Sequence, residues 1–282
     1  MNTGKSIRRH LVTIAASLLL TGVSIGTLAQ TVPAPGASPR IDAIRKAGIL
    51  RVGVVNNAPW LVENTSGQGD PWEGPSWLLA QEYARLLSVK LQPILVSHET
   101  KVPALTANQF DIMIGPLAES AERQKIIDFV TFSNTSVCMF GLASNPKFTK
   151  AQSVEDFNKP DVTIAYFTGA GEEPWVRKRF PNAKHRGVAN SGSPAPIEEV
   201  LAGRSDVAPL NRVLWMTLSK KVKGLAVFPK ENDCQDSKEY ANPLGMGVEK
   251  NQTVFLDWLR AVESRMKPAL LAEEQRATRN LK

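Results

Sequence analysis

One charged side chain in this sequence stands where it could bind an anion. Arg123 follows Glu122 and precedes the apolar segment Ile126–Phe129 in "AERQKIIDFVTFS". A guanidinium group offers a planar pair of N–H donors that fits a carboxylate through two parallel hydrogen bonds. The same pattern also fits a solvated arginine in a helical turn, and the pattern alone favours that simpler interpretation. Both interpretations stay open at this level.

A glycine-rich turn offers a second possible contact with an anion. The residues "TGAGEE", 168–173, follow a predicted strand and open a predicted helix. A turn of this kind points free backbone N–H groups at an anion. A lone glycine-rich turn is equally consistent with a purely structural role.

Strands and helices must position these groups, and the apolar pattern predicts several of them. The predicted elements are strands at 48–56, 90–96 and 161–167 and amphipathic helices at 76–88 and 254–266. Strands that alternate with helices indicate an α/β fold with parallel sheets.

Two segments about 95 residues apart share one pattern, which predicts two similar helix–strand units. They are residues 102–117 and 197–211. Each reads as a helix end, a residue suited to a left-handed cap, an aspartate three residues later and an apolar strand. The cap residues and aspartates are Asn108 with Asp111 and Gly203 with Asp206.

The predicted strands also locate a crevice, because ligands of open parallel sheets bind beyond the carboxyl ends of the strands. Arg123 therefore lies near a predicted crevice rather than on an arbitrary face. The segments at these strand ends are 56–60, 115–123, 168–172 and Asn211.

The N-terminal segment indicates export. Three basic residues precede an apolar run, "LVTIAASLLLTGVSIG", and then "TLAQ". This order is typical of a secretory signal peptide, so residues 1–29 are predicted to be removed after Ala29. An uncleaved anchor is the second interpretation, although the run is short for a spanning helix. Residues 30–40, rich in Pro, Ala, Gly and Ser, are predicted to be a flexible lead-in.

The charge of the chain gives no support to nucleic-acid binding. The full chain carries a formal charge of +7, but the part beyond residue 29 has 31 basic against 27 acidic residues. That part contains no basic run with interleaved aromatic residues, so we expect no nucleic-acid partner.

The cysteines and histidines bear on redox and metal chemistry. An oxidising compartment favours a disulfide between the two cysteines, Cys138 and Cys234, with two buried thiols as the alternative. His98 and His185 have no metal-ligand spacing to a partner and are expected to be surface or structural residues. We therefore expect no metal site and no cofactor.

The order and spacing of several short motifs resemble a known family. Over roughly residues 45–250, the sequence is similar to the family 3 periplasmic solute-binding proteins, the polar amino-acid receptors of ABC importers. The motifs that carry the resemblance are "GILRVGVVNNAPW", "WEGPSWLLAQEYARLL", "VPALTANQFDIMIG", "AERQKIIDFVTFS", "VTIAYFTGAGEE", "VLAGRSDVAPLN" and "LGMGVEK".

The resemblance implies a two-lobed periplasmic-binding-protein clamshell (type II-like), with two hinge crossings near 140–143 and 240–244. The first lobe would comprise 41–141 and 243–282, and the second 142–242. Closure on a ligand and docking of a periplasmic monomer on a membrane ABC permease would follow. The two cysteines would lie close to the crossings, which run side by side in this family.

The resemblance also implies roles for individual residues. Arg123 would bind the carboxylate of a small-molecule ligand, a polar amino acid or a related carboxylate. The glycine-rich turn would supply backbone donors, and two tryptophans would cover the ligand. The implied ligand-binding residues are Arg123, Trp60, Trp72, Ala118, Thr168, Gly169, Ala170, Gly171, Glu172 and Asn211.

The sequence departs from the family at the site for the ligand's ammonium group. Asn211 stands where an acid is usual, and Ala118 and Pro116 replace a Thr or Ser and a Gly. An ammonium buried without a carboxylate partner is costly. Either Glu119, Glu172 or Glu173 supplies the charge, or the ligand has no α-ammonium.

Two other functions remain open. Cyclohexadienyl dehydratases share this fold, and Glu172 or Glu173 could act as a general acid for loss of water. An accessory binding module of a periplasmic dehydrogenase system is the third interpretation. A binding protein without catalysis is the function we favour, since no assembled acid–base set is visible.

Overall fold

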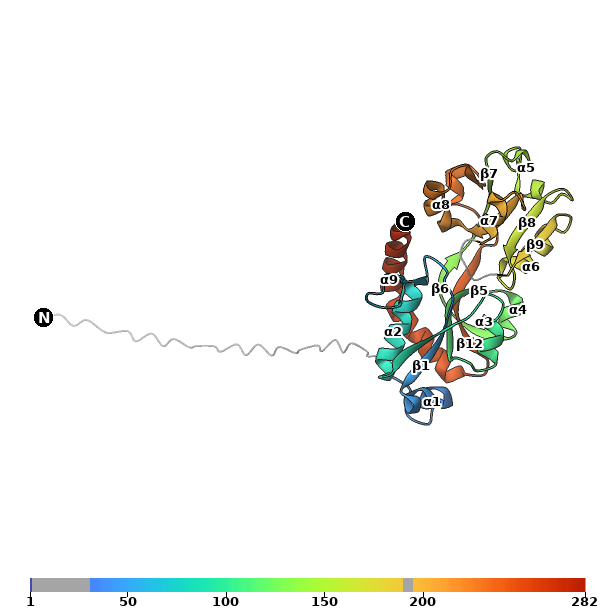
Figure 1. The fold of residues 1–282 in the computed structure, drawn as a ribbon. Helices are drawn as coiled ribbons and strands as arrows, with labels where there is room; N and C mark the ends of the chain where they lie inside the picture. The colour runs from blue at the N-terminus through green and yellow to red at the C-terminus, as the bar shows by residue number, and fades with distance from the viewer. Residues whose placement is uncertain (2–30, 190–194, 282) are drawn as a thin grey trace. The chain divides into compact units, whose positions relative to one another are not determined.

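The computed structural model describes Met1 and residues 31–189 and 195–281 (Figure 1). Residues 32–282 belong to one compact unit that contains two five-stranded sheets. The expected α/β class with two lobes is confirmed. The predicted signal peptide, residues 1–29, lies outside the described residues except for Met1. Among the described residues, no helix has the length and apolarity needed to span a membrane.

The first lobe is built on a sheet of strands β1 (Ile49–Val54), β4 (Lys90–Leu95), β5 (Ile112–Ala118), β6 (Ile127–Thr135) and β12 (Asn242–Glu249). Their order is β4-β1-β5-β12-β6, and β12 runs antiparallel to both neighbours. A short hairpin pairs β2 (Val62–Glu63) with β3 (Trp72–Glu73). The apolar run predicted at 48–56 lies in the buried core of this lobe, whereas the run predicted at 90–96 forms the largely exposed edge strand β4.

The second lobe repeats this arrangement with β7 (Val137–Leu142), β8 (Thr163–Phe167), β9 (Lys184–Val188), β10 (Val207–Asn211) and β11 (Leu225–Phe228). Their order is β11-β7-β10-β8-β9, with β7 antiparallel to both neighbours. Each sheet thus contains one antiparallel strand, β12 or β7, that follows directly on a crossing from the other lobe. The similarity expected from two short segments extends to the order of all five strands.

The helices of the first lobe are α1 (Pro39–Ala47), α2 (Pro75–Leu87), α3 (Lys101–Thr106), α4 (Ala121–Gln124) and α9 (Thr253–Asn280). Those of the second are α5 (Pro146–Thr149), α6 (Glu172–Arg179), α7 (Ala195–Leu201) and α8 (Trp215–Lys221), with 3-10 turns η1 (Val154–Phe157), η2 (Arg212–Leu214) and η3 (Glu231–Cys234). Helix α1 begins inside the expected flexible lead-in, because the side chain of Ser38 caps its first turn and Pro39 suits that turn.

The first crossing between the lobes lies earlier than the sequence indicated. The expected boundary after residue 141 is corrected to the junction of β6 and β7, at Thr135–Val137. The segment "VCMFGL" pairs with β10 and β11, so its backbone hydrogen bonds belong to the second sheet. A run of buried apolar residues does not reveal which sheet it joins. The return crossing is adjacent, since the N–H of Val137 donates to the carbonyl of Glu239.

The two aspartates of the repeated pattern have the same structural role in both lobes. A carboxylate oxygen of Asp111 accepts the N–H of Arg51 at 2.9 Å, and one of Asp206 accepts the N–H of Thr163 at 2.8 Å. Each aspartate thereby fixes the start of its own strand against the neighbouring strand. Asn108 and Gly203 have positive φ angles of 55° and 69°, which confirms the predicted left-handed caps.

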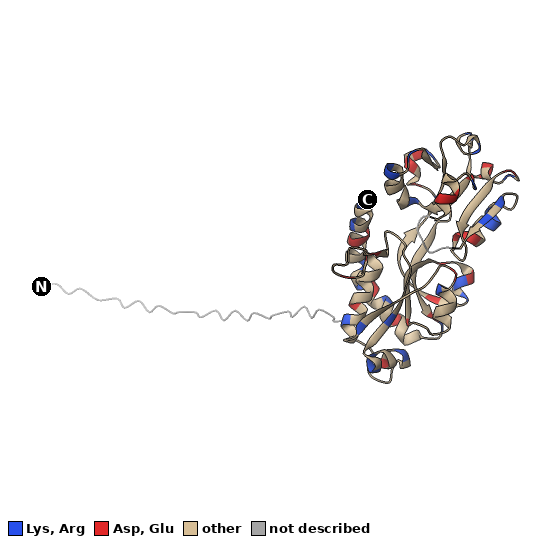
Figure 2. Cartoon of the chain, viewed as in Figure 1, with Lys and Arg blue, Asp and Glu red and all other residues tan. Residues whose placement is uncertain are grey.

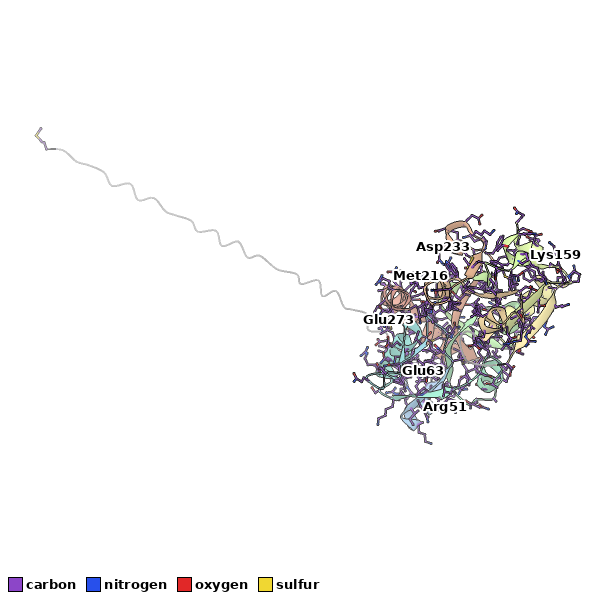
Figure 3. The ribbon with its side chains drawn as sticks, turned by 45° about the horizontal axis from the view of Figure 1, so that its top comes forward. Arg51, Glu63, Lys159, Met216, Asp233 and Glu273 are labelled. Atoms are coloured by element: carbon purple, nitrogen blue, oxygen red, sulfur yellow. A yellow bond between two sulfur atoms is a disulfide. The ribbon has the colours of Figure 1, made fainter. Side chains whose placement is uncertain are left out.

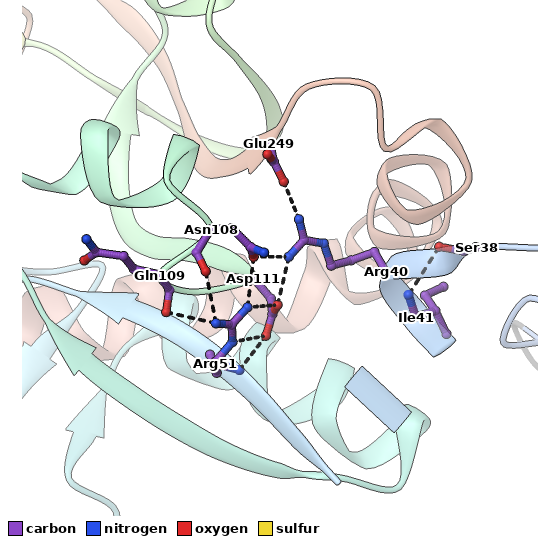
Figure 4. Close-up of polar contacts among 8 residues, drawn as sticks. All are labelled: Ser38, Arg40, Ile41, Arg51, Asn108, Gln109, Asp111 and Glu249. Carbon is purple, nitrogen blue, oxygen red and sulfur yellow. Dashed lines mark hydrogen bonds and ion pairs between the residues drawn. The ribbon is translucent and has the colours of Figure 1, made fainter. Parts of the chain in front are cut away.

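Asp111 is also the centre of an ionic cluster within the first lobe, next to the start of β5 (Figure 4). The guanidinium of Arg51 contacts its carboxylate at 2.8 Å, and that of Arg40 does so at 3.1 Å. Arg40 pairs in addition with Glu249 at the end of β12. This cluster ties α1 to the sheet. Its two arginines also balance the charge of the Asp111 carboxylate, which is buried.

The two cysteines form a disulfide, as expected. Cys138 in β7 is bonded to Cys234 in η3, with 6.1 Å between their Cα atoms. Both sulfur atoms lie within the second lobe, near the two crossings. The bond therefore joins the strand that enters this lobe to the segment that leaves it.

Charged residues of both signs are interspersed along the ribbon of both lobes (Figure 2). The long helix α9 packs on α2 and β6 of the first lobe and then reaches the second. There the hydroxyl of Thr217 in α8 donates to the carbonyl of Leu281 at 3.0 Å. Figure 3 shows Glu273 of α9 and Met216 of α8 on the same side of the molecule.

Candidate functional site

A cavity of about 80 Å³ lies between the lobes, where the ends of β1, β5, β8 and β10 approach one another. This is the crevice predicted from the strand ends. Both lobes supply its walls. The lining residues are Asn56, Asn57, Ala58, Trp60, His98, Lys101, Pro116, Ala118, Arg123, Thr135, Phe167, Ala170, Gly171, Glu172, Leu210, Asn211, Leu214 and Leu244.

Arg123 lines this cavity. The Ser120 hydroxyl caps the short helix α4 by accepting the N–H of Arg123, which fixes the backbone of the arginine. One guanidinium nitrogen donates to the carbonyl of Ala118 at 3.0 Å, and the other lies 3.5 Å from the carbonyl of Gly169 in the opposite lobe. Among the described residues, no carboxylate pairs with Arg123. Its remaining donors are therefore suited to an anion in the cavity.

The glycine-rich turn contributes only its second half to the cavity. Gly169 has a φ of 74°, and a Cβ atom there would lie 2.6 Å from the Cα of Glu99, so this position requires glycine. The N–H of Gly169 already donates to Glu173 at 2.8 Å. Thr168 packs against Gly187 and, like Gly169, does not line the cavity. Ala170 and Gly171 do line it, and Gly171 has an N–H with no partner among the described residues.

Gly171 also makes room for Arg123. A Cβ atom at this position would lie 2.1 Å from the Tyr240 hydroxyl oxygen and 3.1 Å from a guanidinium nitrogen of Arg123. The Tyr240 hydroxyl is buried and has no hydrogen-bond partner among the described residues. Burial raises the pKa of this hydroxyl, so it stays protonated. Tyr240 therefore acts here as a packing surface behind the cavity.

Gly171→Ala is expected to weaken binding of a carboxylate ligand about tenfold, because the added methyl group displaces Tyr240 or Arg123. Tyr240→Phe should restore most of the loss in the double variant, since it removes the atom that the methyl group meets. Titration calorimetry on the two single variants and the double variant measures this. Unchanged affinity in Gly171→Ala, or no recovery in the double variant, would contradict the packing argument.

The sequence analysis missed or misplaced several cavity residues, among them the titratable pair His98 and Lys101. His98 was expected at the surface or in a structural role, yet it lines the cavity and stacks on Phe167 with 5.0 Å between ring centres. Lys101, the first residue of α3, is 3% exposed, and its ammonium nitrogen lies 3.1 Å from Nδ1 of His98. Both follow the end of β4, a strand end left out of the predicted crevice.

Asn211 and Ala118 line the cavity, but neither offers an obvious site for an ammonium group. The Asn211 amide donates to the Thr135 hydroxyl at 2.7 Å, and its oxygen accepts the N–H of Val213 at 3.0 Å. Both ends of this side chain are therefore engaged at the junction of the lobes. Ala118 contributes a carbonyl that Arg123 already occupies.

The two tryptophans expected to cover the ligand lie in different places. Trp60 lines the cavity, and its indole N–H donates to the hydroxyl of Ser133 at 3.0 Å. Trp72 packs in the core of the first lobe and is not among the cavity residues. It belongs to β3, which packs on α2.

Of the three acids considered as ammonium partners, only Glu172 lines the cavity. Glu119 contacts Gln124 and Thr131. Glu173 accepts the N–H of Gly169 in the glycine-rich turn and pairs with Arg177. Within the described ranges, no group of three or more His, Cys, Asp or Glu side chains is close enough to hold a metal ion. The cavity therefore combines two cationic groups with one carboxylate and several neutral polar groups.

Comparison with known proteins agrees with this architecture. The sequence profile described as "Bacterial extracellular solute-binding proteins, family 3" matches residues 50–270. No curated protein sequence matches the chain.

Among solved structures, the ancestral amino acid-binding protein AncCDT-1, a precursor of cyclohexadienyl dehydratase, is 26% identical, with a TM-score of 0.70 over 87% of this chain and 99% of that one. An amino acid ABC transporter substrate-binding protein from Streptococcus pneumoniae, bound to L-arginine, is 19% identical, with a TM-score of 0.70 over 85% and 98%. The L-cysteine solute receptor of Neisseria gonorrhoeae is 16% identical, with a TM-score of 0.70 over 86% and 92%. The last two likenesses show the fold alone.

Proposed function

Because the chain belongs to the family 3 bacterial extracellular solute-binding proteins, we propose that it captures a small carboxylate-bearing ligand between its lobes and presents it to a membrane ABC permease. Export to the periplasm as a monomer is part of this proposal. A polar amino acid or a derivative is the ligand class that the family favours, and solved relatives are described with bound arginine or lysine.

One observation carries the proposal: Arg123 lines the cavity between the lobes without a carboxylate partner among the described residues. Its guanidinium is held by two carbonyl groups, one from each lobe, rather than by an acid. A guanidinium group held in this way is positioned to bind a carboxylate. Without one, some of its N–H donors lack an acceptor. Contact with both lobes would also couple capture of the ligand to their relative position.

A thermal-shift screen of the exported, purified protein tests the proposal. Amino acids and small organic acids are each paired with the corresponding amide, which matches the acid in size but lacks its charge. Ligand at one hundred times its Kd adds about 2.7 kcal/mol to the free energy of unfolding. For a chain of this length, that gain corresponds to a rise in Tm of about 5 to 10 °C.

We expect such a rise with at least one acid and no rise with its amide. If every acid leaves Tm unchanged, or if the amides act as strongly as the acids, carboxylate capture is wrong.

A dehydratase is the second candidate function, because Glu172 and Lys101 face the same cavity as Arg123 and could serve a proton transfer. Turnover of prephenate or arogenate, followed by the absorbance of the aromatic product, separates the enzyme from the binding protein. A binding protein gives no product above the buffer rate, even where these compounds raise Tm.

A further inference from the structure

Lys101 stands out among the charged groups of the chain. It is 3% exposed and lines the cavity, yet none of the ion pairs among the described residues includes it. An ammonium group has three N–H donors, and its one side-chain partner within these residues is Nδ1 of His98. A buried cation with a single neutral partner is costly unless another acceptor arrives.

The neighbours of Lys101 do not supply that acceptor. His98 precedes α3, Arg123 belongs to α4, and Glu172 opens α6 in the other lobe. Burial lowers the pKa of His98 to about 2, with smaller contributions from Lys101 and Arg123, so its imidazole is neutral and accepts from the ammonium. Arg123 repels Lys101, whereas Glu172 attracts it without lying within ion-pair distance.

We propose that Lys101 forms a second anion site, an inference that rests on the proposed function. The ligand is then a small dicarboxylate with one carboxylate on Arg123 and the other on Lys101. Where Lys101 is protonated, two cations and one carboxylate line the cavity, which leaves a surplus of positive charge for the ligand to balance. The cavity volume of about 80 Å³ is far below the roughly 300 Å³ at which pockets for drug-sized molecules begin, so the ligand is short.

Proton uptake on binding is a consequence of this arrangement. Burial, and after it Arg123, lower the pKa of Lys101 to about 7, while Glu172 opposes the shift. Lys101 is therefore largely neutral in the empty cavity at pH 8. A carboxylate placed beside it raises its pKa again, so the bound form holds the proton. Affinity for a dicarboxylate should then fall as pH rises above about 7, by at most about tenfold per pH unit.

Matched ligands test the second anion site directly. Oxalate, malonate and succinate are compared with acetate, propionate and butyrate, in which a methyl group replaces one carboxylate. L-Aspartate and L-2-aminobutyrate make the same comparison with an α-ammonium present. In wild type at pH 7, we expect the best dicarboxylate to bind about 100-fold more tightly than its methyl-ended partner.

Lys101→Met should abolish this preference, so that each dicarboxylate binds no more tightly than its methyl-ended partner. Lys101→Gln serves as a second variant if the first folds poorly, and exposed Lys150→Met is the matched control that keeps the preference. Calorimetry of the dicarboxylate at pH 8, in buffers of different ionisation enthalpy, should show uptake of a proton by wild type and none by Lys101→Met.

The inference is wrong if no dicarboxylate of either series binds, if acids and methyl-ended partners bind alike, or if the preference survives in both Lys101 variants. A monocarboxylate that binds through Arg123 without this preference would leave the proposed function intact. Failure of every acid in the wider screen would instead contradict the proposed function itself.

Discussion

Replacing Arg123 with alanine is expected to abolish measurable binding of the carboxylate ligand while the protein stays folded. Loss of a charge-assisted, two-pronged contact in a cavity costs on the order of 2 to 5 kcal/mol, or about 30-fold to several thousand-fold in Kd. The fold should tolerate the change, because Arg123 makes no ion pair among the described residues and belongs to the short helix α4. Titration calorimetry with an acid found by thermal shift measures the effect.

Two further variants make the Arg123 result specific. Arg123→Lys keeps the charge but loses the planar pair of donors, so it should bind with intermediate affinity. Arg45→Ala removes an exposed arginine from α1, away from the cavity, and should bind as wild type does. Wild-type affinity in Arg123→Ala would show that Arg123 is a solvated surface charge and does not bind the ligand.

Removal of the disulfide is expected to lower the free energy of unfolding by nearly as much as Arg123→Ala lowers the free energy of binding. Its effect on binding itself should be small. The bond between Cys138 and Cys234 closes a loop with a sequence separation of 96 residues. Restricting an unfolded chain over a loop of that length contributes about 4.7 kcal/mol on the chain-entropy account. The double variant Cys138→Ala/Cys234→Ala should therefore unfold at a lower denaturant concentration, measured by tryptophan fluorescence or circular dichroism.

Reduction provides the control for this experiment. Dithiothreitol should lower the stability of wild type toward that of the double variant and leave the variant itself unchanged. Affinity for the ligand should differ little between the two proteins, since neither cysteine lines the cavity. Two reactive thiols in the denatured, unreduced wild-type protein would show that the bond does not form.

The fold could largely be predicted because its signals are local and repeated. Asn108 and Asp111, like Gly203 and Asp206, encode a helix cap and a strand start within four residues. The first crossing could not be placed, because the segment around Met139 is apolar throughout and would be buried in either sheet. Only its hydrogen bonds with β10 and β11 assign it to the second lobe.

The candidate site could be predicted where a motif follows a strand end. Arg123 and Gly171 fit this rule, and both line the cavity. Lys101 could not be recognised from the residues beside it, since "HETKVPAL" reads as an ordinary solvated helix start. Its burial arises from the approach of the second lobe, whose Gly169 packs on the backbone of Glu99. Contacts between distant segments of this kind leave no local pattern.

Trp60 gives the protein its own optical reporter. Of the six tryptophans in the chain, all of which lie in the described part, it alone lines the cavity. Its indole N–H is held by Ser133, whose hydroxyl in turn donates to Glu274 on α9. Indole emission depends on the polarity and charge around the ring, so a ligand entering the cavity changes the emission of this one fluorophore. Ligands can thus be titrated by intrinsic fluorescence, without a dye or an attached label.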